Sequence, residues 1–326
     1  MIIKEVYDKI CNLENILGYK NDNIGIKVLT EYIDDTGKIY NEYINDEYGI
    51  NDDDLVYRYI DVLSKRNIEI ISISDVELKI MQIENFMKDI STNIHHKTLY
   101  RGQKGSYFPE STLFRLYNGT DYDAKLFYKN IKLQAPYIEH MYNKRFSISR
   151  VSKIKDITIF DIAFGKIPYM DILSYIRHRG GSSPLLDVTK SPYIALYFAC
   201  SDIYSNNDCY LYMFAPINRN PTTLGHADLY QVDGQISDER QMVQQSSYII
   251  SLKDNGNGDY AFSSVRSAMA CQYNKRKYGV LKFTIPGKCK NDILRSLHRM
   301  GINEFSIYRD EDAFSRYLTY KTFLGL

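Results

Sequence analysis

The segment from Leu185 to Cys200 constrains the fold of this chain most strongly. Its start is a short apolar run interrupted by Asp187 and Thr189, a spacing that predicts a buried strand with its polar side chains on one side. Ser191 and Pro192 follow, and these residue types favour the N-cap and the first turn of a helix. The sequence therefore predicts a strand that runs directly into a helix, whose N-terminus beside Thr189 and Ser191 would suit an anion.

The hydrophobic pattern of the whole chain predicts an α+β protein. Helical spacing or capping residues predict helices over 1–18, 55–63, 76–93, 121–145, 161–177, 192–200, 291–300 and 312–320. Strand-like runs lie at 26–33, 39–44, 98–102, 185–189, 209–214, 244–252 and 278–286, and the first two are expected to form a hairpin. We expect a small mixed N-terminal accessory module over 1–74 and a domain with a mixed or split sheet over 75–326.

Charge and residue usage exclude several classes of protein. The 41 basic and 40 acidic residues leave a net charge of +1, so nothing attracts the chain generally to nucleic acid or to an anionic membrane. No apolar stretch reaches the roughly 18 residues of a membrane span, and charges interrupt the N-terminus too early for a signal peptide. The five cysteines and six histidines lack zinc-site spacing. We therefore expect a cytoplasmic protein without a metal cofactor or a membrane partner.

Two stretches of the chain carry distinctive motifs. The first stretch is Leu99-Tyr-Arg-Gly-Gln-Lys-Gly-Ser-Tyr-Phe-Pro-Glu-Ser-Thr-Leu-Phe-Arg. The second is His178-Arg-Gly-Gly-Ser-Ser-Pro-Leu-Leu-Asp-Val-Thr-Lys-Ser-Pro-Tyr-Ile-Ala-Leu-Tyr-Phe-Ala. Both resemble the FRG domain, a family named for a Phe-Arg-Gly signature. A third, weaker similarity involves Arg266–Gln272, Tyr278–Phe283 and Leu297–Tyr308. The resemblance covers roughly 75–326, and it implies a bacterial protein, with a toxin or anti-phage defence effector as one expected role.

Three further features follow one another along the chain: Tyr100-Arg-Gly, then Val188-Thr-Lys-Ser leading into Ala195-Leu-Tyr-Phe, and finally Glu304. This order loosely resembles that of mono-ADP-ribosyltransferases of the Arg-Ser-Glu class. The resemblance implies that the substrate is NAD, whose nicotinamide–ribose bond breaks through an oxocarbenium-like state. The acceptor could be a protein, a nucleic acid or water.

The resemblance also implies roles for individual residues. Arg101 would hold the pyrophosphate or ribose of NAD, and Thr189 would steer its nicotinamide end. Glu304 would stabilise the positive charge that develops on the ribose. Gly102 would let the ligand approach the backbone. The other residues expected at the binding site are Gln103, His178, Asp187, Ser191 and Gln272.

Structural explanations stand beside each of these roles. Arg101 could pair with Asp187 inside the fold, and Ser191 is explained by helix capping alone. Glu304 could be a surface carboxylate in a turn, with Glu239 or Gln272 in its place at the site. The alternative function is a non-catalytic module that binds a nucleotide or a protein partner. A carboxylate within reach of Arg101 and Thr189 would favour the enzyme, and its absence would favour the binding module.

Overall fold

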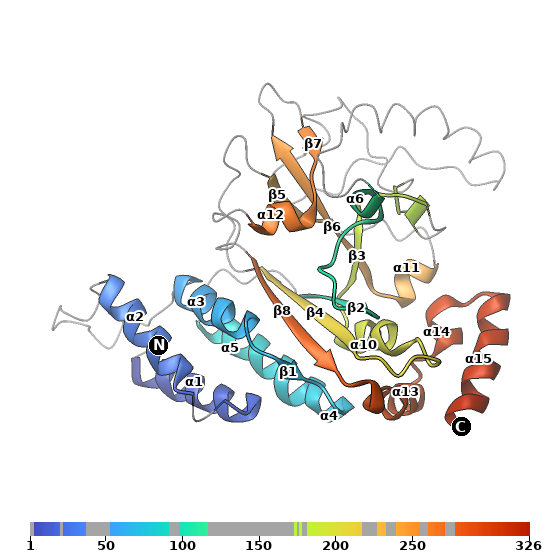
Figure 1. Cartoon of the computed structure of the whole chain (residues 1–326), viewed down its shortest axis with the longest axis horizontal. Helices are drawn as coiled ribbons and strands as arrows, with labels where there is room; N and C mark the ends of the chain where they lie inside the picture. Colours follow the sequence, from blue (N-terminus) through green and yellow to red (C-terminus); the bar gives the residue numbers. More distant parts are fainter. Residues whose placement is uncertain are drawn as a thin grey trace.

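The computed structural model describes residues 3–19, 22–36, 53–90, 98–116, 173–174, 176–177, 181–216, 227–232, 239–254, 260–270 and 278–326 (Figure 1). Its helices are α1 (Ile3–Leu17), α2 (Ile24–Thr36), α3 (Asp53–Ser64), α4 (Ile73–Asp75), α5 (Gln82–Ile90), α6 (Thr112–Leu116), α10 (Pro192–Cys200), α11 (Glu239–Val243), α12 (Val265–Ala270), α13 (Lys290–Arg299), α14 (Glu304–Tyr308) and α15 (Glu311–Leu324). A π-helix, η1 (Val76–Met81), joins α4 to α5, and a 3₁₀ turn, η3 (Gly287–Cys289), precedes α13.

The strands of the described residues form one mixed sheet. They are β1 (Ile68–Glu69), β2 (Leu99–Gln103), β3 (Leu186–Thr189), β4 (Cys209–Pro216), β5 (Ala227–Val232), β6 (Ser246–Asp254), β7 (Tyr260–Phe262) and β8 (Tyr278–Ile285). Their order is β1-β8-β4-β2-β3-β6-β5, with β7 paired to β6. Only the β1–β8 pair is parallel among these described strands. The expected α+β class is confirmed.

The sheet is nearly divided between β2 and β3. β2 pairs with β4 along its whole length, from Leu99 opposite Phe214 to Gln103 opposite Tyr210. On its other side it pairs with β3 at one position, Tyr100 opposite Thr189. Beyond that pair the strands part, and backbone groups that would close a continuous ladder need other partners. The split therefore places polar backbone and side chains of both strands around one opening.

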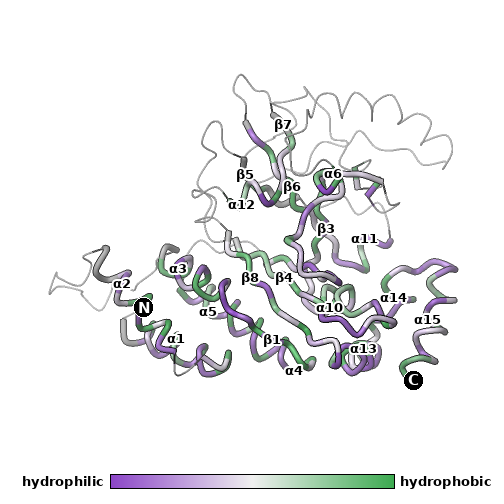
Figure 2. The backbone as a smooth tube through the Cα atoms, in the orientation of Figure 1, coloured by the Kyte–Doolittle hydropathy of each residue, from purple (hydrophilic) through white to green (hydrophobic). Residues whose placement is uncertain are grey.

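Helix α10 covers the sheet next to this split. The helix is apolar along most of its length (Figure 2), and Ile194, Ala195, Leu196 and Tyr197 are among its buried residues. Ser191 caps it, since the Ser191 hydroxyl accepts a hydrogen bond from Ile194 N at 3.4 Å. The strand-to-helix prediction for this segment is confirmed, including the N-cap and the proline in the first turn.

Gly102 allows α10 to lie against β2. A Cβ added to Gly102 would come within 1.8 Å of the carbonyl oxygen of Ala195 and 2.5 Å of the amide nitrogen of Ala199. Both atoms belong to the helix backbone, so rotation of a side chain could not relieve these contacts. The sequence suggested that Gly102 lets a ligand approach the backbone. In the structure, a glycine is needed there because α10 packs closely against β2.

The N-terminal helices α1, α2, α3 and α5 gather beside β1 and β8 (Figure 1). β1 joins the sheet through Ile68, which lies opposite Phe283 of β8. The main hydrophobic cluster runs without interruption from Val6 of α1 through β4, β8 and α10 to Leu324 of α15. The Tyr100 hydroxyl also donates a hydrogen bond to Glu84 of α5. The module predicted over 1–74 therefore shares its core with the rest of the chain.

One N-terminal prediction was wrong. Residues 26–33 were expected to form a strand, but they belong to helix α2. The buried residues Ile24, Val28, Leu29 and Tyr32 recur at helical spacing, and their burial against α1 and α3 outweighs the strand preference of the β-branched residues. The second strand of the expected hairpin, at 39–44, the helix at 121–145 and most of the helix at 161–177 lie outside the described residues.

Most other elements agree with the prediction. The helices at 1–18, 55–63, 291–300 and 312–320 are confirmed, as are the strands at 98–102, 185–189, 209–214, 244–252 and 278–286, with ends shifted by a few residues. Gly18 and Gly301 end their helices at φ +83° and +82°, a conformation that glycine adopts readily. The helix predicted from 76 is confirmed, but it begins with α4 and a π-helix turn. Its cap is Ser72, whose amide donates to the Asp75 carboxylate at 3.2 Å.

Candidate functional site

The split between β2 and β3 opens into a pocket of about 420 Å³. Its walls come from both strands, from Phe198 of α10, from α11 and the start of β6, and from Tyr308 of α14. This volume lies within the range of small-molecule sites. Stretches that are distant in the sequence thus meet here, namely 100–107, 177, 187–201, 240–246 and Tyr308. The two main sequence resemblances had included 100–107 and most of 187–201.

Arg101 bridges the two strands where they part. Its Nη1 donates to the backbone oxygen of Asp187 at 2.6 Å, and its Nε donates to the side-chain oxygen of Gln103 at 3.0 Å. Burial lowers the pKa of the guanidinium to about 10, against the opposing effect of the Asp187 charge, so Arg101 remains protonated at neutral pH. Its Nη2 has no hydrogen-bond partner among the residues that the structure describes. A partly buried cation with unused donors can bind an anionic ligand.

The carboxylate of Asp187 belongs to a different ion pair. Its Oδ2 lies 2.6 Å from Nη2 of Arg177, and its side chain remains about one third exposed. Within the described part of the chain, neither Oδ1 of Asp187 nor Nε of Arg177 has a hydrogen-bond partner, although both atoms are buried. The expected alternative of an Arg101–Asp187 ion pair is therefore replaced by a backbone contact. Asp187 is a pocket carboxylate with an unsatisfied oxygen.

Positive charge dominates the described walls of the pocket. The basic side chains that line it are Arg101, Lys104, Arg177 and Arg240. Asp187 is the one carboxylate on those described walls. Lys104 also lies 3.8 Å from Asp202, at the limit of an ion pair. A partly closed pocket with this excess of cations favours a ligand that carries more than one negative charge.

An aromatic wall faces these cations. Two guanidinium groups lie near the Tyr308 ring, with Cζ of Arg240 4.4 Å and Cζ of Arg316 5.4 Å from its centroid. Phe198 meets the Tyr308 ring edge to face, with their centroids 6.2 Å apart. Tyr100 and Tyr107 also contribute to the pocket walls. Rings and guanidinium planes of this kind can stack on a planar heterocycle.

The pocket brings together five of the nine residues predicted for the site. Arg101, Gly102, Gln103, Asp187 and Thr189 line it. The Gln103 side chain is buried and donates to Tyr107 O at 2.9 Å, so both of its polar atoms serve to hold Arg101 and the following turn. Thr189 Oγ1 donates to Gln244 O at 2.7 Å and accepts from Ser191 N at 3.1 Å. The polar atoms of Gln103 and Thr189 are thus used in hydrogen bonds within the protein, and these two side chains help to hold the pocket walls in place.

Two of the other predicted residues lie away from the described pocket walls. Ser191 is the cap of α10, and Glu304 opens α14 on the far side of Tyr308. His178 and Gln272 lie outside the described residues. Glu239, the alternative to Glu304, is exposed and pairs with Arg309 at 2.5 Å.

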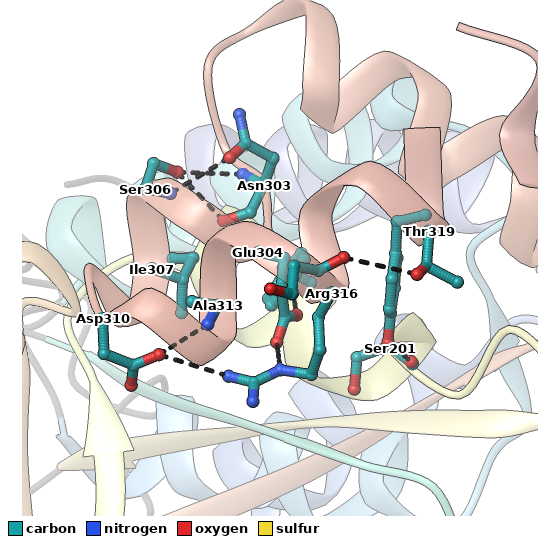
Figure 3. A network of polar contacts seen from close by, with 12 residues as sticks. Ser201, Asn303, Glu304, Ser306, Ile307, Asp310, Ala313, Arg316 and Thr319 are labelled. Atoms are coloured by element: carbon teal, nitrogen blue, oxygen red, sulfur yellow. Dashed lines mark hydrogen bonds and ion pairs between the residues drawn. The ribbon is translucent and has the colours of Figure 1, made fainter. Parts of the chain in front are cut away.

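Glu304 is buried in a network that joins three helices (Figure 3). Its carboxylate accepts hydrogen bonds from Nε of Arg316 on α15, at 2.5 Å, and from the hydroxyl of Tyr197 on α10. Burial, followed by the Glu304 charge, raises the pKa of Tyr197 far above its ordinary range. A second contact runs from the Tyr320 hydroxyl to the backbone oxygen of Ser201, which lines the pocket. The network fixes α14, and with it Tyr308, against α10.

Loss of the Glu304 carboxylate is expected to destabilise the folded protein. Glu304→Ala leaves the buried Tyr197 hydroxyl without its acceptor and should lower the free energy of unfolding by about 2 kcal/mol. Tyr197→Phe should cost less, and a double-mutant cycle between the two sites should give a coupling of about 1–2 kcal/mol. Denaturant unfolding measures both quantities. Additive effects of the two substitutions would contradict the coupling.

Sequence reasoning missed several residues of the pocket, among them Arg177, Arg240 and Tyr308. Arg240 and Gln244 stand four positions apart around the turn of α11, a spacing that places two side chains on one face. Tyr308 stands four positions after Glu304, so the late motif supplies an aromatic residue to the pocket where a carboxylate was expected. The i,i+4 spacing was the signal available for Arg240 and for Tyr308, whereas Arg177 had none.

The fold and the pocket define an α+β protein with a split sheet and an arginine-lined site at the split. The FRG domain model matches residues 96–208, which contain β2, β3 and α10. The chain thus contains an FRG domain, as the two sequence stretches indicated. No curated protein and no solved structure matches it.

Two further findings concern metals and membranes. Within the described ranges, no three residues among His, Cys, Asp and Glu come together in a way that could hold a metal ion. None of the described helices combines the length and apolar character needed to cross a membrane.

Proposed function

We propose that the pocket of this FRG-domain protein binds a phosphorylated nucleotide, with NAD as the ligand to test first. The observation that carries this proposal is the excess of basic side chains on the described pocket walls. Arg101, Lys104, Arg177 and Arg240 line them, and Asp187 is the one carboxylate there. A diphosphate would neutralise that excess, and the partly buried guanidinium of Arg101 is suited to bidentate contacts with phosphate oxygens. The aromatic wall at Tyr308 would receive a base or a nicotinamide ring.

A second candidate function is cleavage of the bound NAD, and the position of Asp187 favours it. Its carboxylate lies on the strand that carries Thr189, next to the Arg101 contact, and its Oδ1 has no partner among the described residues. A carboxylate there would stabilise an oxocarbenium-like ribose. The nicotinamide–ribose C–N bond would break with its electron pair leaving on nicotinamide. A new C–O bond to water or an acceptor hydroxyl would form, with release of one proton.

This role is proposed for Asp187 in place of Glu304. Glu304 was expected to stabilise the ribose, but the pocket walls described here do not include it, and its two oxygens already accept hydrogen bonds from Tyr197 and Arg316. Removal of NAD in the cytoplasm would harm the host cell, which fits the expected role of a toxin or anti-phage effector. Neither that role nor the acceptor is needed for the binding proposal.

The binding proposal is tested by calorimetric titration of the full chain with NAD and with ADP-ribose. Arg101→Ala should weaken binding by about tenfold to a hundredfold, since a buried charged contact to phosphate is lost. Arg101→Lys keeps the charge without the fork and should bind at an intermediate level. Arg299→Ala, an exposed substitution on α13 away from the pocket, is the matched control and should bind like the wild type.

Catalysis is tested on the same proteins by following NAD loss and nicotinamide release. Asp187→Asn should retain binding within a few-fold while NAD loss stops. Binding of neither NAD nor ADP-ribose by a folded wild type would overturn the nucleotide proposal. Binding without NAD loss, including in the presence of cell lysate as a source of acceptor, would reject the enzyme and keep the binding module.

A further inference from the structure

Helix α15 exposes an apolar surface that the pocket does not use. The helix lies at the edge of the molecule, in red in Figure 1, and packs inward mainly through Ala313 and Leu324. Phe314 and Leu318 on its outer side are each 49% exposed. Phe305 of α14 meets the Phe314 ring edge to face, with their centroids 5.7 Å apart, and is also largely exposed. Phe314 and Leu318 are neighbours at i,i+4, so these three residues form one apolar patch on the outer side of α14 and α15.

A charged residue stands at each end of this patch. Glu311, Phe314, Leu318 and Lys321 follow one another at intervals of three, four and three residues, so they form one stripe along α15. All four are exposed. Glu311 and Lys321 make no ion pair with a described residue. They are also too far apart to pair with each other, about 15 Å along the helix.

The stripe is complementary to itself when reversed. Glu311 and Lys321 lie five residues on either side of position 316, and Phe314 and Leu318 lie two residues on either side of it. In two antiparallel copies of α15 related by a two-fold axis at this level, Phe314 of each copy would meet Leu318 of the other. Glu311 of each would then meet Lys321 of the other. The spacing of three and four residues is that of a helix pair packed side by side.

We propose that this stripe is a homodimer interface, formed by antiparallel pairing of α15 with the same helix of a second copy of the chain. Charge complementarity identifies the partner as a second copy, because the one exposed stripe supplies both members of each ion pair. The contact is small compared with permanent dimer interfaces, so the dimer should be reversible and concentration-dependent.

Sedimentation velocity of the full chain over a wide concentration range tests the proposal. The wild type should show a reversible monomer–dimer equilibrium. Glu311→Lys would place two lysines opposite each other at both ends of the interface and should raise the dimer dissociation constant by about tenfold or more. The double variant Glu311→Lys with Lys321→Glu restores both pairs and should restore dimerisation. Leu318→Asp should abolish it.

Asp312→Lys is the matched control. Asp312 is exposed in the same first turn of α15, so its replacement carries the same change of charge and the same cost at the helix N-terminus. It lies about 100° around the helix from Glu311 and off the stripe, so dimerisation should remain at the wild-type level. A wild type that is monomeric at every concentration would overturn the proposal. So would a dimer that Glu311→Lys leaves intact, or one that the double variant fails to restore.

Discussion

Gly102→Ala is expected to lower the free energy of unfolding by about 3 kcal/mol or more, enough to prevent folding in a protein of ordinary stability. The added Cβ would lie within 1.8 Å of the Ala195 oxygen and 2.5 Å of the Ala199 nitrogen. Relief requires α10 to move away from β2, which would break the main hydrophobic cluster on both sides of the helix. The soluble yield and the denaturant midpoint of the purified variant measure the effect.

Gly105→Ala is the control for this experiment. A Cβ at Gly105 would come within 2.8 Å of the Tyr107 ring, but Tyr107 is half exposed and its ring can rotate away. The variant should therefore unfold within about 0.5 kcal/mol of the wild type. Gly102→Ala with wild-type stability would show that α10 does not lie against β2 as described.

The protein is expected to unfold cooperatively as the pH rises above about 10. Burial raises the pKa of Tyr59, Tyr100 and Tyr197 well above the ordinary value of 10.0, and it raises that of Tyr212 to about 12. A group whose pKa is raised in the folded state stabilises that state fully at a pH below its unfolded pKa. This stabilisation is lost as the pH rises above that value. Each fully buried tyrosine should then lower the free energy of unfolding by about 1.4 kcal/mol for every pH unit above 10.

Tyrosinate absorbance and far-ultraviolet circular dichroism follow the alkaline transition together. The chain has 30 tyrosines and no tryptophan, so the near-ultraviolet signal reports tyrosine ionisation directly. Tyr59→Phe removes a buried hydroxyl that has no hydrogen-bond partner among the described residues, and it should move the alkaline midpoint upward. Tyr204→Phe, at a residue that is 77% exposed, should leave the midpoint unchanged. Loss of all secondary structure before the pH reaches 10 would contradict the assignment.

Local signals in the sequence predicted the elements around the pocket. The strand at Leu186–Thr189 and the helix that follows were predicted because capping and alternation act within a few residues. At Ile24–Thr36, however, strand propensity and helical periodicity pointed in different directions, and tertiary burial decided for the helix. Only the packing of α1 and α3 against this segment distinguishes a helix from a strand here. That packing involves residues outside the segment, so the local sequence does not show it.

The site was predictable in part for the same reason. Arg101 and Asp187 stand out because each lies within a motif beside a strand end. Arg177, Arg240 and Tyr308 reach the pocket from three other segments, and no local pattern connects them. The sequence could not show what lies against Gly102, because a glycine beside a strand can allow close approach of a ligand or of a helix. In the structure, helix α10 lies against it.

The pairing of β1 with β8 has a consequence for any shortened form of this protein. Beyond Ile68 and Glu69, the Ile70 amide also donates to the Thr284 oxygen at 2.9 Å, so these few residues pair with the last part of the outer edge of β8. A fragment that begins at residue 75 would leave the hydrogen-bonding groups of that edge unpaired and expose apolar residues that α1, α2 and α3 now cover. Bare strand edges beside apolar surface are templates for aggregation. The short β1 thus leaves less of the β8 edge open to pairing with strands of other chains.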